Sequence, residues 1–395
     1  MSKSDSQKII IVGAGVAGLT SALCLRKSGH DVTVLEQAPA LQDIGAGIQL
    51  SPNALHVLNA IDVCHKLESK ADTPTEVSIR DFKSGTPLLT QTMGGAFTRR
   101  YGAGYWHCHR ADLIEALFNA AKEAGIQILF NKKITAHEET PETVFVKIQS
   151  SKDISADLLI GADGISSTIR STLQPNSMAN FTGQIAWRGL VPTERLKTHP
   201  PEGVSVWVGP GKHFVAYRLR QGSLMNFIAV EERTAWTEEN WMLEGDINTL
   251  TTAFSAWDSP IQDILEACTE TYLWGLFNRP APKTWHSCRT VLIGDACHPI
   301  LPFMAQGAAM AIEDAYVLAT SLENKTCIEA GLNLFQKKRQ KRVKNLYDIS
   351  RRNASLYHAS GIKAVARNAL FAGARMFPQA LSYQLDKVYG LNVTK

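Results

Sequence analysis

The sequence has few features of a secreted or membrane-bound protein. Its seven cysteines are an odd number, lie far apart and include no CxxC pair, so we expect neither a disulfide framework nor a structural zinc site. The most apolar long stretch, residues 291–318, contains Asp295, His298, Glu313 and Asp314, which exclude a simple membrane span. The polar segment MSKSDSQ leads directly into a strand pattern and resembles neither a signal peptide nor a transit peptide. We therefore expect a cytoplasmic protein.

An excess of charge of one sign is also missing. A net charge of +4 on 395 residues is too small and too dispersed to indicate nucleic-acid binding, although it suits small anionic ligands. One basic run, residues 337–342, is predicted to be the solvated face of a helix. Leu334, Phe335, Val343 and Leu346 would form the apolar side of this helix.

The patterns that are present begin with a βαβ unit. A strand is expected over residues 8–12, a helix over 16–28 and a second strand over 31–36, with Gly29 ending the helix. Further helices are expected over 53–59 and 110–124, and residues 72–105 have the irregular pattern of strands and turns. Additional strands are expected over 126–130, 144–148 and 158–160.

The second half changes to a β-rich pattern and then back to helices. Strands are expected over 184–190, 204–208, 214–219 and 224–230, with a hairpin turn at Gln221 and Gly222. A buried strand over 291–293, a helix over 306–322 and a basic helical segment from about residue 332 follow. The predicted fold class is α/β: a Rossmann-like nucleotide-binding βαβ domain, interrupted by a β-sheet substrate domain and closed by C-terminal helices.

Six segments describe this organisation. The nucleotide-binding domain is expected over 1–72, 107–180 and 286–330, the substrate sheet over 73–106 and 181–285, and the C-terminal helices over 331–395.

The turn after the first strand has the GxGxxG pattern. Gly13 allows a tight turn, Gly15 lets the backbone approach a pyrophosphate, and Gly18 lets helix and strand pack closely. Ala17 lies inside the motif, where the helix N-terminus offers free N–H groups to phosphates. Glu36, at the end of the second strand, can accept hydrogen bonds from a ribose. The motif predicts a dinucleotide site but does not distinguish FAD from NAD.

Further motifs resemble one enzyme family over essentially the whole chain. They are residues 45–54, 109–113, 161–170, 186–190 and 294–309. Their order and spacing are similar to those of the single-component (class A) FAD-dependent aromatic hydroxylases, nearest to salicylate hydroxylase and 3-hydroxybenzoate 6-hydroxylase. The motifs are specific for the superfamily and less specific for the substrate.

The resemblance implies that the nucleotide-binding domain holds FAD. Asp295 would hold the ribityl chain, and backbone N–H groups of Gly307 and Ala308 would face the flavin edge where negative charge develops on reduction. Arg110 and Asp163 would also contact the cofactor. Gly47 and Ile48, in the loop over residues 45–49, would lie near the flavin ring. Because a second GxGxxG motif is missing, NADH or NADPH would bind only transiently.

The resemblance also implies the chemistry. NAD(P)H would reduce the flavin, O2 would form a flavin C4a-hydroperoxide, and one oxygen atom would enter a small phenolic acid of the salicylate or 3-hydroxybenzoate type. His213 is the candidate base, and Tyr217 shares its strand face and would contact the substrate. Pro302 would lie beside the substrate, and Gln306 would bond its polar groups. We reject His298 as the base, because it lies in the cofactor motif.

Other interpretations stay open at this point. The ring could be a hydroxypyridine carboxylate or a urate-like ring, or the chain could be a flavin-binding redox protein that does not hydroxylate. His107 and His109 have no third ligand nearby, so no metal site is expected. The sequence does not decide between NADH and NADPH, whether decarboxylation accompanies hydroxylation, or whether the protein is a homodimer.

Overall fold

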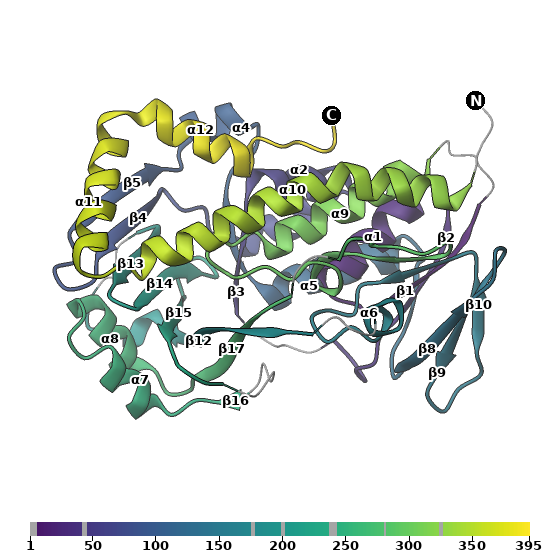
Figure 1. Cartoon of the computed structure of the whole chain (residues 1–395), viewed down its shortest axis with the longest axis horizontal. Helices are drawn as coiled ribbons and strands as arrows, with labels where there is room; N and C mark the ends of the chain where they lie inside the picture. The colour runs from purple at the N-terminus through teal and green to yellow at the C-terminus, as the bar shows by residue number, and fades with distance from the viewer. Residues whose placement is uncertain are drawn as a thin grey trace.

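The computed structural model contains two large sheets with helices packed against them (Figure 1). It describes residues 6–41, 46–174, 178–198, 202–236, 243–279, 282–323 and 327–395. None of the helices in this described part is long and apolar enough to cross a membrane. The α/β fold class expected from the sequence is confirmed.

The first sheet is parallel, and distant parts of the chain contribute its strands. Each strand is a short apolar run, as parallel strands buried on both faces require. In spatial order the strands are β18 (Thr290–Leu292), β11 (Leu158–Gly161), β1 (Lys8–Val12), β2 (Asp31–Leu35) and β7 (Gln127–Leu129). The βαβ unit of β1, α1 (Val16–Lys27) and β2 lies within one residue of its predicted bounds.

The second sheet has eight strands, and α7 (Ile247–Ala253) and α8 (Ser259–Ala267) cover one of its faces. Its order is β16 (Leu243–Glu244), β17 (Tyr272–Asn278), β12 (Asn180–Pro192), β15 (Leu224–Glu232), β14 (Lys212–Leu219), β13 (Val204–Gly209), β4 (Glu76–Asp81) and β5 (Pro87–Thr92). Trp187, Trp207 and Phe214 pack on α7 and α8. The opposite face is therefore left to meet the nucleotide-binding domain.

The remaining elements connect or cover these sheets. The short strands are β3 (Gly47–Leu50), paired with β6 (Trp106–His109), and a separate sheet of β8 (Ile134–Glu139), β9 (Val144–Ile148) and β10 (Ile154–Ala156). The helices are α2 (Pro52–Ala60), α3 (Cys64–Leu67), η1 (Glu68–Lys70), α4 (Gly95–Tyr101), α5 (Arg110–Glu123), α6 (Thr168–Leu173), η2 (Thr193–Arg195), η3 (Gly294–Ala296), α9 (Gly307–Leu322), α10 (Ile328–Tyr357), α11 (Gly361–Met376) and α12 (Pro378–Tyr389).

The sequence predicts only strands and turns over residues 72–105, whereas the structure has a helix there, α4. It is short and ends at Gly102, whose φ of +74° is a left-handed helix cap. Its side chains Phe97 and Tyr101 pack edge-on against Tyr389 of α12. A partner from the far end of the chain stabilises this helix, so local periodicity could not predict it.

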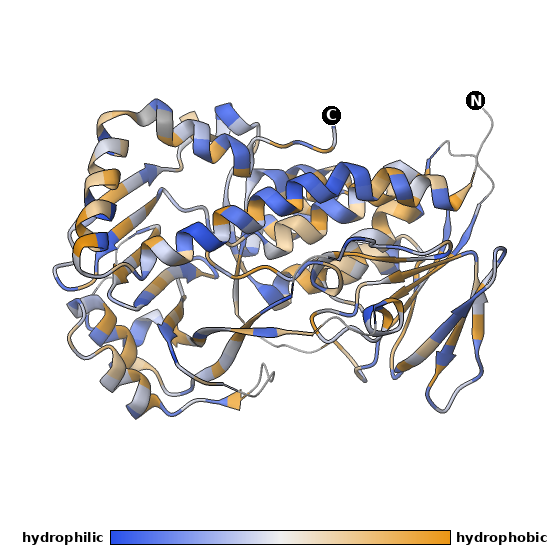
Figure 2. Ribbon diagram, viewed as in Figure 1, coloured by the Kyte–Doolittle hydropathy of each residue, from blue (hydrophilic) through white to orange (hydrophobic). Residues whose placement is uncertain are grey.

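The basic run of residues 337–342 on α10 is only partly the solvated helix face that the sequence predicts. Lys337, Lys338 and Lys341 are exposed, and α10 is largely hydrophilic on the side seen in Figure 2. Arg339, however, is 1% exposed and bonds Glu313 and Asp314 of α9, with 2.7 Å between its Nε and Asp314 Oδ1. Burial alone would lower the pKa of Arg339, but these carboxylates outweigh it and raise that pKa. One member of the run is therefore part of the core.

We expect Arg339→Met to lower the free energy of unfolding by about 3–5 kcal/mol, because two buried carboxylates would lose the cation between them, leaving Glu313 with Arg342 and Asp314 with His298. Urea unfolding followed by circular dichroism measures this change. Lys341→Met, in the same run but exposed, is the control and should change stability by less than about 0.5 kcal/mol. Equal effects of the two substitutions would show that the buried contact does not stabilise the fold.

Candidate active site

The turn between β1 and α1 leaves open space in front of one glycine. A Cβ atom on Gly13 would lie 2.5 Å from the carbonyl oxygen of Ala162, and one on Gly18 would lie 1.9 Å from that of Gly13. A Cβ on Gly15 would meet nothing within 4 Å. Packing therefore requires the first and third glycines, whereas Gly15 borders a space at the N-terminus of α1 that suits a pyrophosphate.

A carboxylate at the end of β2 lies beside this turn. Glu36 accepts hydrogen bonds from the backbone N–H groups of Ala14, at 2.8 Å, and Ala38, at 2.9 Å. These contacts hold its carboxylate next to the open space in front of Gly15. The arrangement suits binding of ribose hydroxyls, as the sequence motif predicted.

A second carboxylate lies across the parallel sheet, where β18 ends. Asp295 is exposed to solvent. Desolvation by the surrounding protein nevertheless raises its pKa, against the opposing effect of His298 and Arg110. Nη1 of Arg170 donates to the carbonyl oxygen of Ala296 at 3.1 Å and so holds the turn that carries Asp295.

The carboxylate of Asp163 is used within its own segment. It accepts hydrogen bonds from Ser167 Oγ at 2.5 Å and from the N–H of Thr168 at 2.8 Å, at the start of α6. Any contact of Asp163 with a cofactor is therefore left to its backbone.

The strand β3 joins the two halves of the site. The N–H of Gly47 donates to Oδ1 of Asn226 on β15 at 2.8 Å, and the carbonyl oxygen of Ala46 accepts from the N–H of Arg110 at 2.9 Å. Tyr217 packs so closely on Gly47 that a Cβ there would lie 2.4 Å from its hydroxyl. Glycine is therefore required where the substrate sheet meets Gly47 and Ile48. Residue 45, included in the expected loop, lies outside the described residues.

The side chain of Gln306 holds the start of α9. It is buried, accepts from Asn53 Nδ2 at 3.2 Å and donates to Ser51 Oγ at 3.0 Å. These two contacts fix the helix start at Gly307, and the expected contact of Gln306 with the substrate stays a prediction. Pro302, in the preceding loop, is exposed.

His213 lies on the face of the second sheet that turns away from α7 and α8. It is 3% exposed, and its ring packs on Phe303 and Tyr357, with centroid distances of 5.2 and 5.4 Å. Its Nδ1 lies 2.8 Å from Nε2 of His358. Burial, reinforced by His358, lowers the pKa of His213 well below its ordinary value, so the ring is neutral at pH 7.

Strand register assembles the rest of this face. His213 pairs with Val230, which pairs with Ala186, and in the next row Val215 pairs with Ile228, which pairs with Arg188. His213 and Tyr217 therefore share one face, as alternation along the strand predicted. Arg188 is buried, with its guanidinium 5.4 Å from the ring centroid of Tyr272 and 5.5 Å from that of Trp274.

Sequence reasoning missed several residues of this site. Tyr357 and His358 stand in a segment without a chemical motif, Phe303 lies inside a motif but was assigned no role, and only tertiary structure brings all three to His213. Arg188 was inside a motif that carried the family resemblance, and its place on the face with His213 could have been derived from strand alternation and pairing.

The other histidines have structural surroundings. His298 is buried and bonds Oδ2 of Asp314 at 2.7 Å, away from the substrate sheet. His107 packs on the ring of Tyr217, and burial lowers its pKa to about 3. Across the described ranges, no group of His, Cys, Asp or Glu residues could hold a metal ion.

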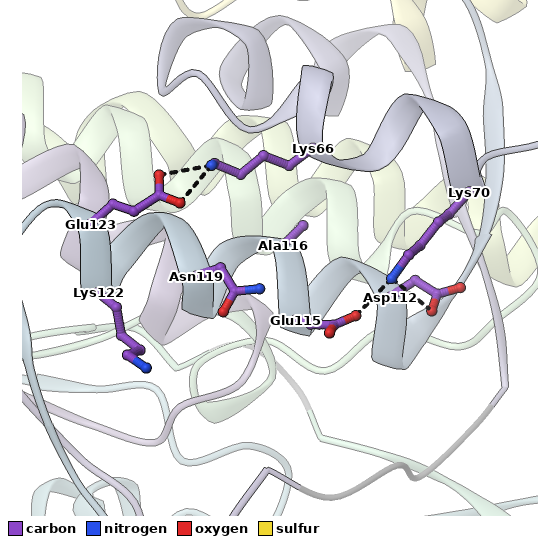
Figure 3. A pocket seen from close by; sticks show the side chains of 8 residues that line it. All are labelled: Lys66, Lys70, Asp112, Glu115, Ala116, Asn119, Lys122 and Glu123. Carbon is purple, nitrogen blue, oxygen red and sulfur yellow. Dashed lines mark hydrogen bonds and ion pairs between the residues drawn. The ribbon is translucent and has the colours of Figure 1, made fainter.

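A separate surface hollow of about 490 Å³ lies along α5, and Figure 3 shows its lining residues. Its charges are paired internally: Lys66 bonds Glu123, and Lys70 bonds Glu115, each at 2.7 Å. The glycine turn and the His213 face contribute no residue to it, so this hollow is not part of the candidate site.

Comparisons with known proteins agree with this geometry. Residues 6–350 match the family described as FAD binding domain. The chain is 34% identical over 355 residues to 3-amino-4-hydroxybenzoate 2-monooxygenase of Streptomyces platensis, covering 89% of this chain and 88% of that protein. It is 32% identical over 392 residues to 3-hydroxybenzoate 6-hydroxylase of Polaromonas naphthalenivorans, covering 98% and 96%. The crystal structure of Klebsiella pneumoniae HpxO complexed with FAD and uric acid superposes with a TM-score of 0.82, at 25% identity and 92% coverage of each chain.

Fold, site and relatives define an FAD-dependent monooxygenase of aromatic rings, with NAD(P)H as electron donor and O2 as oxidant. The chain belongs to the FAD binding domain family. The cofactor and the enzyme class expected from the motifs are confirmed.

Gly15→Val tests the open space at the glycine turn. The side chain fits the apoprotein, because Gly15 has extended backbone with φ of −81° and no neighbour near its Cβ position. It would occupy the expected pyrophosphate space, so we expect FAD affinity to fall about 10- to 100-fold, the value of one or two charge-assisted hydrogen bonds. Fluorescence titration of the apoprotein with FAD measures the affinity, and the melting temperature without FAD should not change. Unaltered FAD affinity would contradict the assignment.

Asp295→Ala tests the second carboxylate. If Asp295 binds the ribityl hydroxyls as the sequence predicts, its loss should weaken FAD binding, again by about 10- to 100-fold. The flavin content of the purified protein, measured by absorbance, reports this loss. Asp348→Ala, which removes an exposed carboxylate on α10, is the control. A mutant purified with full flavin content would remove Asp295 from the cofactor site.

Proposed function

We propose that this monooxygenase hydroxylates a small phenolic acid of the salicylate or 3-hydroxybenzoate type, with His213 as the base. The observation that carries the proposal is the state of His213: a neutral, buried imidazole among aromatic rings. Within the described residues its Nε2 has no hydrogen-bond partner, and this atom is not sealed inside the protein. A lone pair in such surroundings suits acceptance of a phenolic proton.

The acid group of the substrate would be bound by Arg188. Arg188 lies on the same face of the sheet, two strands away from His213 and one row further along. Burial and the positive charge of Arg110 lower the pKa of Arg188, so an anion between these cations would be stabilised. A hydroxybenzoate carries both groups that these side chains would bind, a hydroxyl facing His213 and a carboxylate facing Arg188.

The cofactor would lie between the two sheets. We propose that it contacts Gly13, Gly15, Ala17, Gly18, Glu36, Gly47, Ile48, Arg110, Asp163, Asp295, Gly307 and Ala308, as the sequence predicted. Bound FAD, reduced by NAD(P)H, would activate O2 and supply one oxygen atom to the ring. The protein's own contribution is to orient the ring on the sheet, remove its phenolic proton and exclude water through Phe303 and Tyr357.

A substrate screen tests this function. Monohydroxybenzoates, 3-amino-4-hydroxybenzoate, hydroxypyridine carboxylates and urate are added to the holoenzyme, and NADH and NADPH oxidation is followed with product identification. A hydroxylated benzoate formed in step with NAD(P)H consumption would support the proposal. Product from a pyridine or purine ring alone, or hydrogen peroxide with every compound, would contradict it.

His213→Ala tests the base. We expect hydroxylation at pH 7 to slow by about 100-fold, the usual contribution of general-base catalysis, while FAD stays bound. The loss should shrink as the pH approaches the pKa of the free phenol, about 10, because the substrate then arrives ionised. Product formation and flavin content are measured from pH 6.5 to 9.5. A loss of the same size at every pH would show that His213 only shapes the site.

A further inference from the structure

A chain of close polar contacts leads from His213 to the surface. Nδ1 of His213 lies 2.8 Å from Nε2 of His358, which follows α10. Nδ1 of His358 lies 3.1 Å from Oε1 of Glu232, at the end of β15. The side chain of His358 is 3% exposed, whereas that of Glu232 is 58% exposed. These three side chains connect the buried face of the sheet with solvent.

We propose that His213, His358 and Glu232 form a proton relay that carries the phenolic proton of the substrate to water. The proposal rests on the proposed function, in which Nε2 of His213 accepts that proton. His358 and Glu232 touch neither substrate nor cofactor in this scheme, so they are positioning and transfer residues rather than catalytic ones.

The relay sets the tautomer of each ring. A carboxylate only accepts, so the hydrogen between His358 and Glu232 is on Nδ1 of His358. Nε2 of His358 then carries a lone pair and accepts from Nδ1–H of His213. Nε2 of His213 is consequently the unprotonated nitrogen that faces the substrate. Nε2 of Gln184 lies 3.3 Å from the same Nδ1 of His358, so this tautomer requires the amide of Gln184 to turn over and present its oxygen as a second acceptor.

Proton transfer along this chain balances. The O–H bond of the phenol breaks as Nε2 of His213 gains a proton, Nδ1 of His213 passes its proton to Nε2 of His358, and Nδ1 of His358 passes its proton to Glu232. The products are a phenolate, two neutral imidazoles in the opposite tautomers and a carboxylic acid, which releases its proton to water. When the hydroxylated product takes up a proton, the reverse sequence restores the starting tautomers.

Burial explains why a proton accepted by His213 has to move on to His358 and Glu232. Its imidazolium form is disfavoured, so a proton left there would return to the phenolate. Burial also lowers the pKa of His358, although Glu232 opposes this shift. Of the neighbouring groups, Tyr357 stays neutral, because burial raises its pKa to about 12, and Lys212 points away toward Glu231, 3.6 Å from its Nζ. Neither buried ring can therefore keep the proton.

Backbone contacts hold the relay in place. The N–H of Gly211 donates to the carbonyl oxygen of His358 at 3.1 Å, and the N–H of Glu232 donates to the carbonyl oxygen of Gly211 at 2.9 Å. The turn between β13 and β14 thus fixes both outer members of the chain relative to His213. This fixed spacing is what directional proton transfer requires.

The first experiment determines which ring nitrogen of His213 and of His358 carries the hydrogen in the holoenzyme without substrate. Nitrogen-15 NMR of labelled histidine side chains, assigned with His213→Ala and His358→Gln, should show Nδ1 protonated and Nε2 unprotonated in both rings. A proton on Nε2 of His213 in the free enzyme would overturn the relay, whatever the substrate proves to be.

The second experiment blocks proton transfer to Glu232, the last step of the relay. Glu232→Gln keeps an oxygen that accepts a hydrogen bond but cannot take a proton. With 3-hydroxybenzoate as the probe, stopped-flow absorbance should show phenolate formation slowed about tenfold at pH 7. The loss should disappear at high pH, and KM should stay unchanged. Glu194→Gln, an exposed carboxylate of the same sheet domain, is the control and should behave as the wild type.

The outcomes separate the relay from the proposed function. Correct tautomers with no hydroxylation of any hydroxybenzoate would refute the substrate and still support the hydrogen-bond chain. Hydroxylation by the wild type with an unaltered rate and pH profile in Glu232→Gln would refute the relay and leave the function intact. A raised KM without a changed pH profile would show a merely structural role and would also refute it.

Discussion

The buried contact of Arg339 with Glu313 and Asp314 is the constraint on which the arrangement of the site depends. Asp314 accepts from the N–H of Gly294 at 2.9 Å and so holds the turn before Asp295. Glu313 accepts from Asn53 Nδ2 at 2.6 Å. One guanidinium thereby fixes, through two carboxylates, the start of α2, the start of α9 and the end of β18. Arg342 also contacts Glu313, at 2.9 Å, and His298 contacts Asp314, at 2.7 Å, but Arg339 is the cation that joins the two carboxylates.

Helix α10 carries that constraint from the cofactor half to the substrate half. Its 30 residues span about 45 Å and run along α9 toward the second sheet in Figure 1. Beyond Arg339, Ser350 donates to the carbonyl oxygen of Leu301 at 2.9 Å and anchors the loop that brings Phe303 to His213. The residue after the helix, His358, then contacts His213 itself. Cofactor and substrate surfaces thus share one rigid element.

Much of the fold was predictable because its signals are local. The glycine turn, the apolar run of β1 and the alternation along β14 each depend on neighbours within a few residues, and their elements were predicted closely. Helix α4 was missed because Tyr389 stabilises it from the other end of the chain. The contacts that hold Gln306 could not be predicted, because its partners Ser51 and Asn53 are more than 250 residues away in sequence.

The sequence by itself determined the class of the protein, the cofactor and the candidate base. Class and cofactor followed from motifs that resemble the aromatic hydroxylases, whereas the glycine turn and the strand face of His213 followed from backbone conformation, helix dipole and strand alternation among residues close together in the chain. Only the tertiary structure decided how the candidate base is held, since His358 and Glu232 reach His213 through the packing of α10 on the second sheet. It also placed Arg339 in the core, because a charge is buried only where a distant opposite charge meets it.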